Sequence, residues 1–129
     1  MENWKKNFLV ISIIIIVIAL DLLLYFKTDK LMENTRNDLL KLEKKIDENE
    51  IEDSKKEAEK INKNWEKTEN TLSFFIEHEE VEKVSLKMAI IEENTKNEEF
   101  KSALEDIAET KHLLKHIADK YNLTLKNIF

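Results

Sequence analysis

The sequence predicts an all-α protein in which an N-terminal transmembrane helix is followed by a three- to four-helix bundle or hairpin domain. Residues 8–26, FLVISIIIIVIALDLLLYF, contain one charged residue, Asp21. As a helix they reach about 28 Å at ~1.5 Å per residue, close to a hydrocarbon core of ~30 Å. The chain has no Gly and no Pro, where ordinary usage of about 7% and 5% gives roughly nine and six. Because these residues most readily break helices, nearly the whole chain is expected to be helical.

Changes in composition divide the chain into four segments. Residues 1–7 form a short polar N-terminal segment and residues 8–26 a transmembrane anchor. Residues 27–53 form a juxtamembrane amphipathic helix, and residues 54–129 an acidic helical domain. A signal peptide has an apolar stretch of roughly 7–15 residues. Here the apolar character resumes beyond Asp21, so we expect the anchor to be retained.

The orientation of the anchor follows from the lysines beside it. Lys5 and Lys6 precede the apolar run, which favours an N-terminus inside the cell and an extracytoplasmic C-terminal domain at the cell membrane. Lys27, Lys30 and Arg36 follow the run and weaken the asymmetry. The predicted localisation is therefore a single-pass protein of the cell membrane.

Asp21 is the candidate intramembrane polar residue. A carboxylate at mid-membrane costs about 2.5–3.5 kcal/mol on insertion scales. Asp21 lies near the end of the apolar run, and Tyr25, four residues later, shares its helix face and can donate a hydrogen bond to it. We interpret Asp21 as a near-interface or protonated carboxyl group. Contact with another membrane protein is the alternative.

Apolar spacing predicts the helices of the remaining chain. After the anchor, small or apolar residues recur in steps of four and three, which predicts one buried seam on a continuous helix. These seam residues are Thr28, Met32, Thr35, Leu39, Leu42 and Ile46. Ser54 and Thr95 are each followed three residues later by Glu, which predicts that each starts a helix in a capping box.

Weaker signals mark the other helix ends. We expect a break near residues 78–80, a loop over residues 94–97 and a stop of the last helix at Asn122. Phe74 lies about 180° around its helix from Trp65 at ~100° per residue, so burial in a central helix is expected. The apolar tail, residues 123–129, is expected to fold back on the bundle, with a docking peptide as the alternative.

Composition excludes several functions. Residues 27–129 hold 19 basic and 25 acidic residues and only one arginine. This argues against nucleic acid as a partner, because nucleic acid requires a basic surface. Without cysteine there is no thiolate chemistry, and without glycine there is no glycine-rich phosphate loop. We expect no enzymatic activity and no cofactor.

Three histidines are the weak candidates for a metal site. His112 and His116 are spaced i, i+4, a spacing at which two imidazoles can share a zinc ion. A third strong ligand can come only from His78 or a surface carboxylate. We interpret the histidines as solvated or half-buried, and a metal- or ligand-sensing role is the second alternative function.

The motifs resemble one known family. The anchor, Trp65 followed by LSFFIEHEEV at residues 72–81, and the closing LTLKNIF at residues 123–129 carry the resemblance. They resemble a family of small single-pass bacterial membrane proteins, found mainly in clostridia and termed domain of unknown function 4363. Glu79 stands where the family pattern leads us to expect Asp. The resemblance implies a helical, membrane-tethered bacterial protein and brings no known activity.

The predicted function is a non-enzymatic, single-pass membrane protein whose helical domain binds another protein. The partner-binding candidates are Trp65, Phe74, Phe75 and His78. The alternative is a structural coiled-coil subunit of a membrane or division-type complex, in which residues 28–46 pair with another chain. The expected partners are the lipid bilayer and a protein, with a homo-oligomer as one option.

Overall fold

The part of the chain that the structure describes contains four α-helices. The computed structural model describes residues 2–74 and 76–128, with side chains up to Tyr121. The helices are α1 (Glu2–Asp47), α2 (Ile51–Leu72), α3 (His78–Lys96) and α4 (Phe100–Ile128). The prediction of an all-α protein is confirmed.

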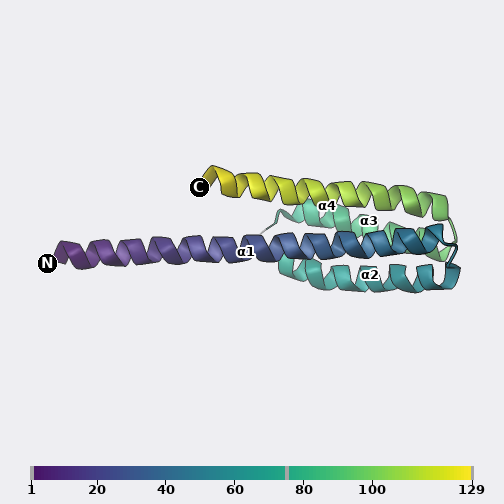
Figure 1. The fold of residues 1–129 in the computed structure, drawn as a ribbon, viewed down its shortest axis with the longest axis horizontal. Coiled ribbons are helices and arrows are strands. Elements are labelled where there is room, and N and C mark those ends of the chain that lie inside the picture. Colours follow the sequence, from purple (N-terminus) through teal and green to yellow (C-terminus); the bar gives the residue numbers. More distant parts are fainter. Residues whose placement is uncertain (1, 75, 129) are drawn as a thin grey trace.

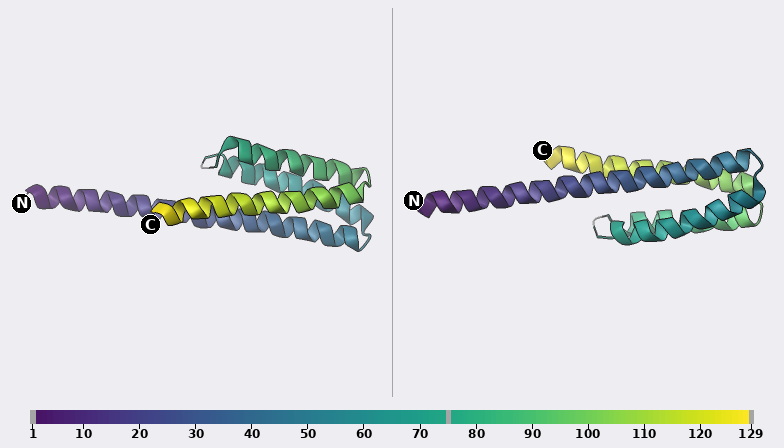
Figure 2. Two further views of the ribbon diagram at one scale, coloured as in Figure 1. Left: turned by 90° about the horizontal axis from the view of Figure 1, so that it is seen from above. Right: turned by 60° about the horizontal axis from the view of Figure 1, so that its bottom comes forward.

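The helices form a bundle in which each helix has two neighbours. α1 packs against α2 and α4, and α3 packs against the same two helices. Short connections reverse the chain between successive helices, so the order is up, down, up, down (Figure 1). Figure 2 shows from two further directions that α1 projects from one end of the bundle, beyond the C-terminal end of α4.

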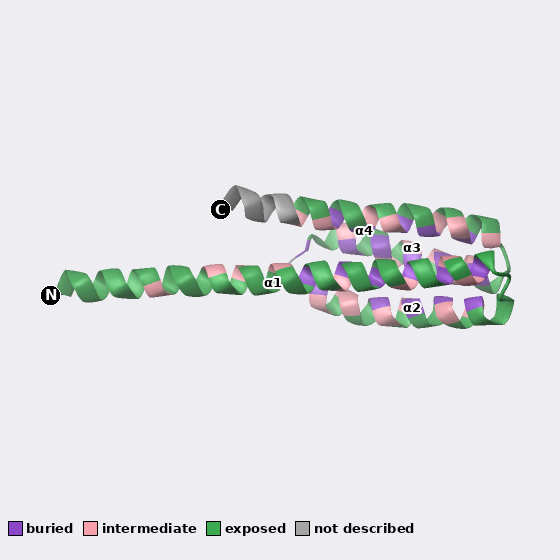
Figure 3. Ribbon diagram, viewed as in Figure 1, coloured by how far each residue is buried: buried purple, intermediate pink, exposed green. Residues whose placement is uncertain are grey.

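α1 joins the apolar run to the bundle without a break. At about 1.5 Å per residue, its 46 residues give a rod about 69 Å long. Its N-terminal half is mostly exposed (Figure 3). Among the described residues this is the one helix long and apolar enough to cross a membrane, which is consistent with a single membrane span or a signal sequence.

The C-terminal half of α1 is one wall of the bundle core. All six seam residues predicted from the spacing are buried, so the predicted seam is confirmed. α2, α3 and α4 supply further apolar residues to the same core, in agreement with one buried stripe on each helix. Its fully buried members include Leu39, Leu42, Leu72, Val84, Ile107 and Leu114.

The two predicted capping boxes are wrong. α2 begins at Ile51, and its N-cap residue Glu50 makes no side-chain cap bond. Ser54 lies inside α2, where its Oγ donates a hydrogen bond to the Glu50 carbonyl oxygen at 2.6 Å. Thr95 lies inside α3 and donates to the Ile91 carbonyl oxygen at 2.7 Å. Both hydroxyls are buried, and the carbonyl four residues earlier is the acceptor they reach within the helix.

Two non-glycine residues in the left-handed region provide the reversals at one end of the bundle. Asn49 has φ 59° between α1 and α2, and Glu98 has φ 60° between α3 and α4. Asn tolerates this region better than most residues, whereas Glu98 carries a steric cost. The helices can therefore reverse direction in a chain without glycine.

Three other helix ends also differ from the prediction. Residues 78–80, the predicted break, form the first turn of α3, and the break lies between Leu72 and His78. α3 continues to Lys96, so the connection to α4 begins three residues later than the predicted loop at 94–97. α4 does not stop at Asn122 but continues to Ile128. The predicted packing of the apolar tail lies outside the described residues, because side chains from residue 122 onward are not described.

Candidate functional site

Trp65 belongs to the core and not to a binding surface. Its side chain is 2% exposed. The indole Nε1 donates a hydrogen bond to Ser85 Oγ at 2.8 Å, and Ser85 Oγ donates to the Val81 carbonyl oxygen at 3.0 Å. Trp65 therefore joins α2 to α3, and the prediction that it contacts a partner is wrong. A buried indole needs a partner for its N–H, and the sequence could not identify which residue provides it.

Phe74 is exposed, contrary to the expectation of burial. α2 ends at Leu72, so Phe74 lies in the turn that leads to α3 rather than in a central helix. Its side chain is 88% exposed, the highest value among the large apolar residues described. Phe74 remains accessible to a partner. The neighbouring candidate, Phe75, lies outside the described residues.

His78 is also accessible and is the first residue of α3. Its side chain is 77% exposed, and its Nε2 lies 3.2 Å from Glu82 Oε1, an ion pair when the imidazole is protonated. Of the four partner-binding candidates, Phe74 and His78 thus lie on the surface, at the same end of the bundle.

The three histidines do not form a cluster. His78 begins α3, whereas His112 and His116 lie on α4, where both are exposed. Within the described part of the chain, no group of three His, Asp or Glu side chains is placed to hold a metal ion. The structure does not bring together the residues that a metal sensor would use.

Asp21 and Tyr25 lie one turn apart on the projecting part of α1. Both side chains are half-buried, and no hydrogen bond joins them in the structure. The Tyr25 ring packs beside Phe26, with 5.4 Å between the ring centroids. The predicted bond between Tyr25 and Asp21 is therefore not formed.

A polar cleft of about 710 Å³ lies on the surface between the packed helices α1 and α2, near the end from which α1 projects. Its lining combines the buried floor of Ile61 and Trp65 with side-chain amides at the rim. The amides of Asn34, Asn37 and Asn64 have no hydrogen-bond partner within the described part of the chain. They are open to water or to a ligand with complementary polar groups.

An apolar hollow of about 390 Å³ lies on the outer face of α3 and α4. We call it the Leu86 hollow, after its most prominent apolar residue, which is 63% exposed. It is lined by Lys83, Leu86, Lys87, Glu109, His112 and Leu113. The apolar side chains of Leu86 and Leu113 thus lie inside a rim that carries charges of both signs.

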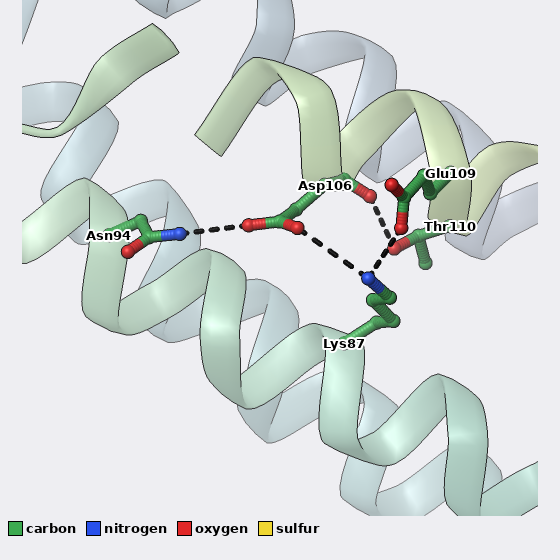
Figure 4. A network of polar contacts seen from close by, with 5 residues as sticks. All are labelled: Lys87, Asn94, Asp106, Glu109 and Thr110. Atoms are coloured by element: carbon green, nitrogen blue, oxygen red, sulfur yellow. Dashed lines mark hydrogen bonds and ion pairs between the residues drawn. The ribbon is translucent and has the colours of Figure 1, made fainter. Parts of the chain in front are cut away.

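A polar network fixes the two helices beneath this hollow (Figure 4). Lys87 on α3 donates a hydrogen bond to Glu109 Oε2 and lies 3.6 Å from Asp106 Oδ1, both on α4. Asn94 donates to Asp106 Oδ2 at 2.8 Å, and Thr110 Oγ1 donates to the Asp106 carbonyl oxygen at 2.6 Å. The contacts join residues of both helices and hold α3 and α4 in one register.

The charge of Lys87 is stabilised by this network. The hydrogen bond that Lys87 donates to Glu109 raises the pKa of Lys87 above its usual value of 10.5. The negative charges of Glu109 and Asp106 raise this pKa further, whereas partial burial of the amine lowers it. Sequence reasoning missed the network because its members come from two helices whose register is not encoded locally. The available signal was the spacing of Asp106 and Glu109, which places two carboxylates on one helix face.

Comparison with known proteins identifies the family. The family model described as Domain of unknown function (DUF4363) matches residues 22–128, and the chain belongs to this family. Searches of curated proteins and of solved structures gave no match.

Proposed function

We propose that this member of the DUF4363 family is a single-pass membrane protein whose helical bundle binds another protein without catalysing a reaction. The apolar half of α1 would be the membrane span. The bundle would then be held beside the membrane by a continuous helix rather than by a flexible linker. A rigid connection of this kind suits a protein that presents a surface at a fixed height above the bilayer.

The observation that carries the proposal is the Leu86 hollow. Leu86 is exposed although it lies in the middle of α3, and Leu113 and His112 border the same depression. The hollow follows the groove between two antiparallel helices, a shape into which the apolar face of a partner helix can pack. Lys83 and Glu109 at the rim can pair with charges of either sign on that helix.

Site-specific photocrosslinking in cells tests this proposal. A photoreactive amino acid at Leu86 is expected to give one defined adduct with another protein. The matched control is the same amino acid at Leu40, a second exposed leucine, which lies on α1 away from α3. The adduct should disappear when Leu113→Arg is added. Equal crosslinking at the two positions, or adducts unaffected by Leu113→Arg, would contradict binding at the hollow.

The same experiment distinguishes a homo-oligomer, because a second copy gives an adduct of twice the chain mass. The coiled-coil alternative predicts a different contact. It requires residues 28–46 to pair with another chain, but the seam residues are packed inside the chain's own bundle. Crosslinking at Leu39, which is fully buried, is therefore expected to give only monomer.

The proposed orientation places the bundle outside the cytoplasm. The chain has no cysteine, so a single cysteine at exposed Asn97 provides a unique label site. Labelling of intact cells by a membrane-impermeant maleimide is expected. Labelling only after lysis would place the bundle in the cytoplasm and direct the search to cytosolic partners.

A further inference from the structure

The turn between α2 and α3 lies part-way along α1, and beyond it only α1 and the C-terminal end of α4 continue (Figures 1 and 2). α2 contains 22 residues, as many as α1 has from Phe26 to Asp47. The two helices are packed side by side and joined by only three residues. Leu72 at the end of α2 is therefore level with Phe26, the last residue of the apolar run. Figures 1 and 2 show the turn at this level from all three directions.

The exposure of Phe74 is fixed by the packing of the residues around it. Leu72 is fully buried, and Ile76 is buried on the other side of the turn. The Glu77 amide donates a hydrogen bond to the Tyr121 hydroxyl at 2.9 Å, which ties the turn to α4. Because Leu72 and Ile76 both enter the core, Phe74 cannot turn inward without withdrawing one of them.

We propose that Phe74 inserts into the interfacial layer of the same lipid bilayer that α1 spans, giving the protein a second membrane contact. The proposal rests on the membrane span of the proposed function. An aromatic ring in water is unfavourable, whereas at this level the ring meets the boundary between headgroups and acyl chains. Tyr25 and Phe26 mark the same boundary on α1.

The contact would restrict the tilt of the bundle. A bundle attached by α1 alone can lean in any direction about the point where α1 enters the bilayer. A second contact at the turn between α2 and α3, to one side of the α1 axis, limits that freedom. Glu77 and Glu79 lie beside Phe74, so neutral lipid is favoured over anionic lipid, whose headgroups repel carboxylates.

Fluorescence quenching in phosphatidylcholine vesicles tests the insertion. Three single-cysteine variants of the full chain, Phe74→Cys, Leu86→Cys and Ile14→Cys, are labelled with an environment-sensitive dye. Phospholipids carrying nitroxide groups then report which dyes touch lipid. Leu86 is the matched control, because it is an exposed apolar residue further from the projecting end. Ile14 lies within the apolar run and tests the membrane span itself.

The expected result is a blue-shifted and quenched dye at positions 14 and 74, with no quenching at 86. If the dye at position 14 is quenched and the dyes at positions 74 and 86 are quenched to the same extent, the inference is overturned and the membrane span is left intact. Absence of quenching at 14 overturns the span, and the inference with it. Quenching at 74 that appears only at a high protein-to-lipid ratio indicates contact between copies and also overturns the inference.

Discussion

Removal of the Trp65 side chain tests the central contact of the bundle. Trp65→Ala deletes a fully enclosed indole and its hydrogen bond to Ser85. Large-to-small changes of buried aromatic residues cost about 3–5 kcal/mol. A bundle of this size is stable by roughly 5–15 kcal/mol, so the variant should lose a large part of its free energy of unfolding.

Two milder substitutions separate the hydrogen bond from the packing. Trp65→Phe retains an aromatic ring and loses the N–H donor, so the hydrogen-bond part of its effect is about 1 kcal/mol. Ser85→Ala leaves the buried N–H of Trp65 without its acceptor, at a cost of about 1–3 kcal/mol. The double variant should be less destabilised than the sum of the two, because no donor is left unpaired.

The assay is guanidinium unfolding of the full chain in non-ionic detergent, followed by far-ultraviolet circular dichroism. Trp4→Ala is the matched control, because Trp4 is 71% exposed on the projecting part of α1 and its loss should change stability by less than about 0.5 kcal/mol. If Trp65→Ala is no more destabilising than Trp4→Ala, the placement of Trp65 between α2 and α3 is refuted.

Two further predictions concern a helix start and an ion pair. Ser54→Ala should change the free energy of unfolding by only a few tenths of a kcal/mol, because Ser54 is not an N-cap and Ala is the better helix former. A loss of about 1 kcal/mol, measured by chemical denaturation, would indicate that Ser54 does cap the helix. Lys87→Met should cost about 1 kcal/mol at neutral pH. Because folding raises the pKa of Lys87, the charged amine stabilises the fold at every pH below its unfolded pKa. This stabilisation is lost as the pH rises through the folded pKa, so the difference in unfolding free energy between Lys87→Met and wild type should shrink above pH 10.5. Unfolding measured across this range checks the trend. The control is Lys83→Met, on the same helix, since Lys83 has no ion-pair partner among the described residues. If the stability difference between Lys87→Met and wild type persists at high pH, the ion-pair explanation is wrong.

The helices and their buried faces could be predicted from the sequence because both are local properties. The absence of Gly and Pro removes the strongest interruptions, and the steps of four and three place Leu39 and Leu42 on one face of α1. The length and apolar character of residues 8–26 identify the one candidate membrane span in the same way. Each of these statements depends on neighbouring residues in the chain alone.

Tertiary structure decided the helix ends and the roles of the individual side chains. A serine or threonine three residues before Glu can cap a helix or bond back within one. Burial of Ser54 and Thr95 against neighbouring helices selects the second arrangement. α2 ends at Leu72, where the chain reverses, and this leaves Phe74 outside. Trp65 is inside because it lies on the face of α2 that packs against α3.

The candidate surfaces depend on helices that are distant in the sequence. The Leu86 hollow and the Lys87 network form only when α3 and α4 are in register, and the height of Phe74 follows from the pairing of α2 with α1. The sequence by itself determined an all-α chain with a candidate anchor and three to four further helical segments, because helical periodicity is encoded every few residues. Only the packed bundle decided that Phe74 and Leu86 face solvent and where the helices end, because these depend on which helices become neighbours.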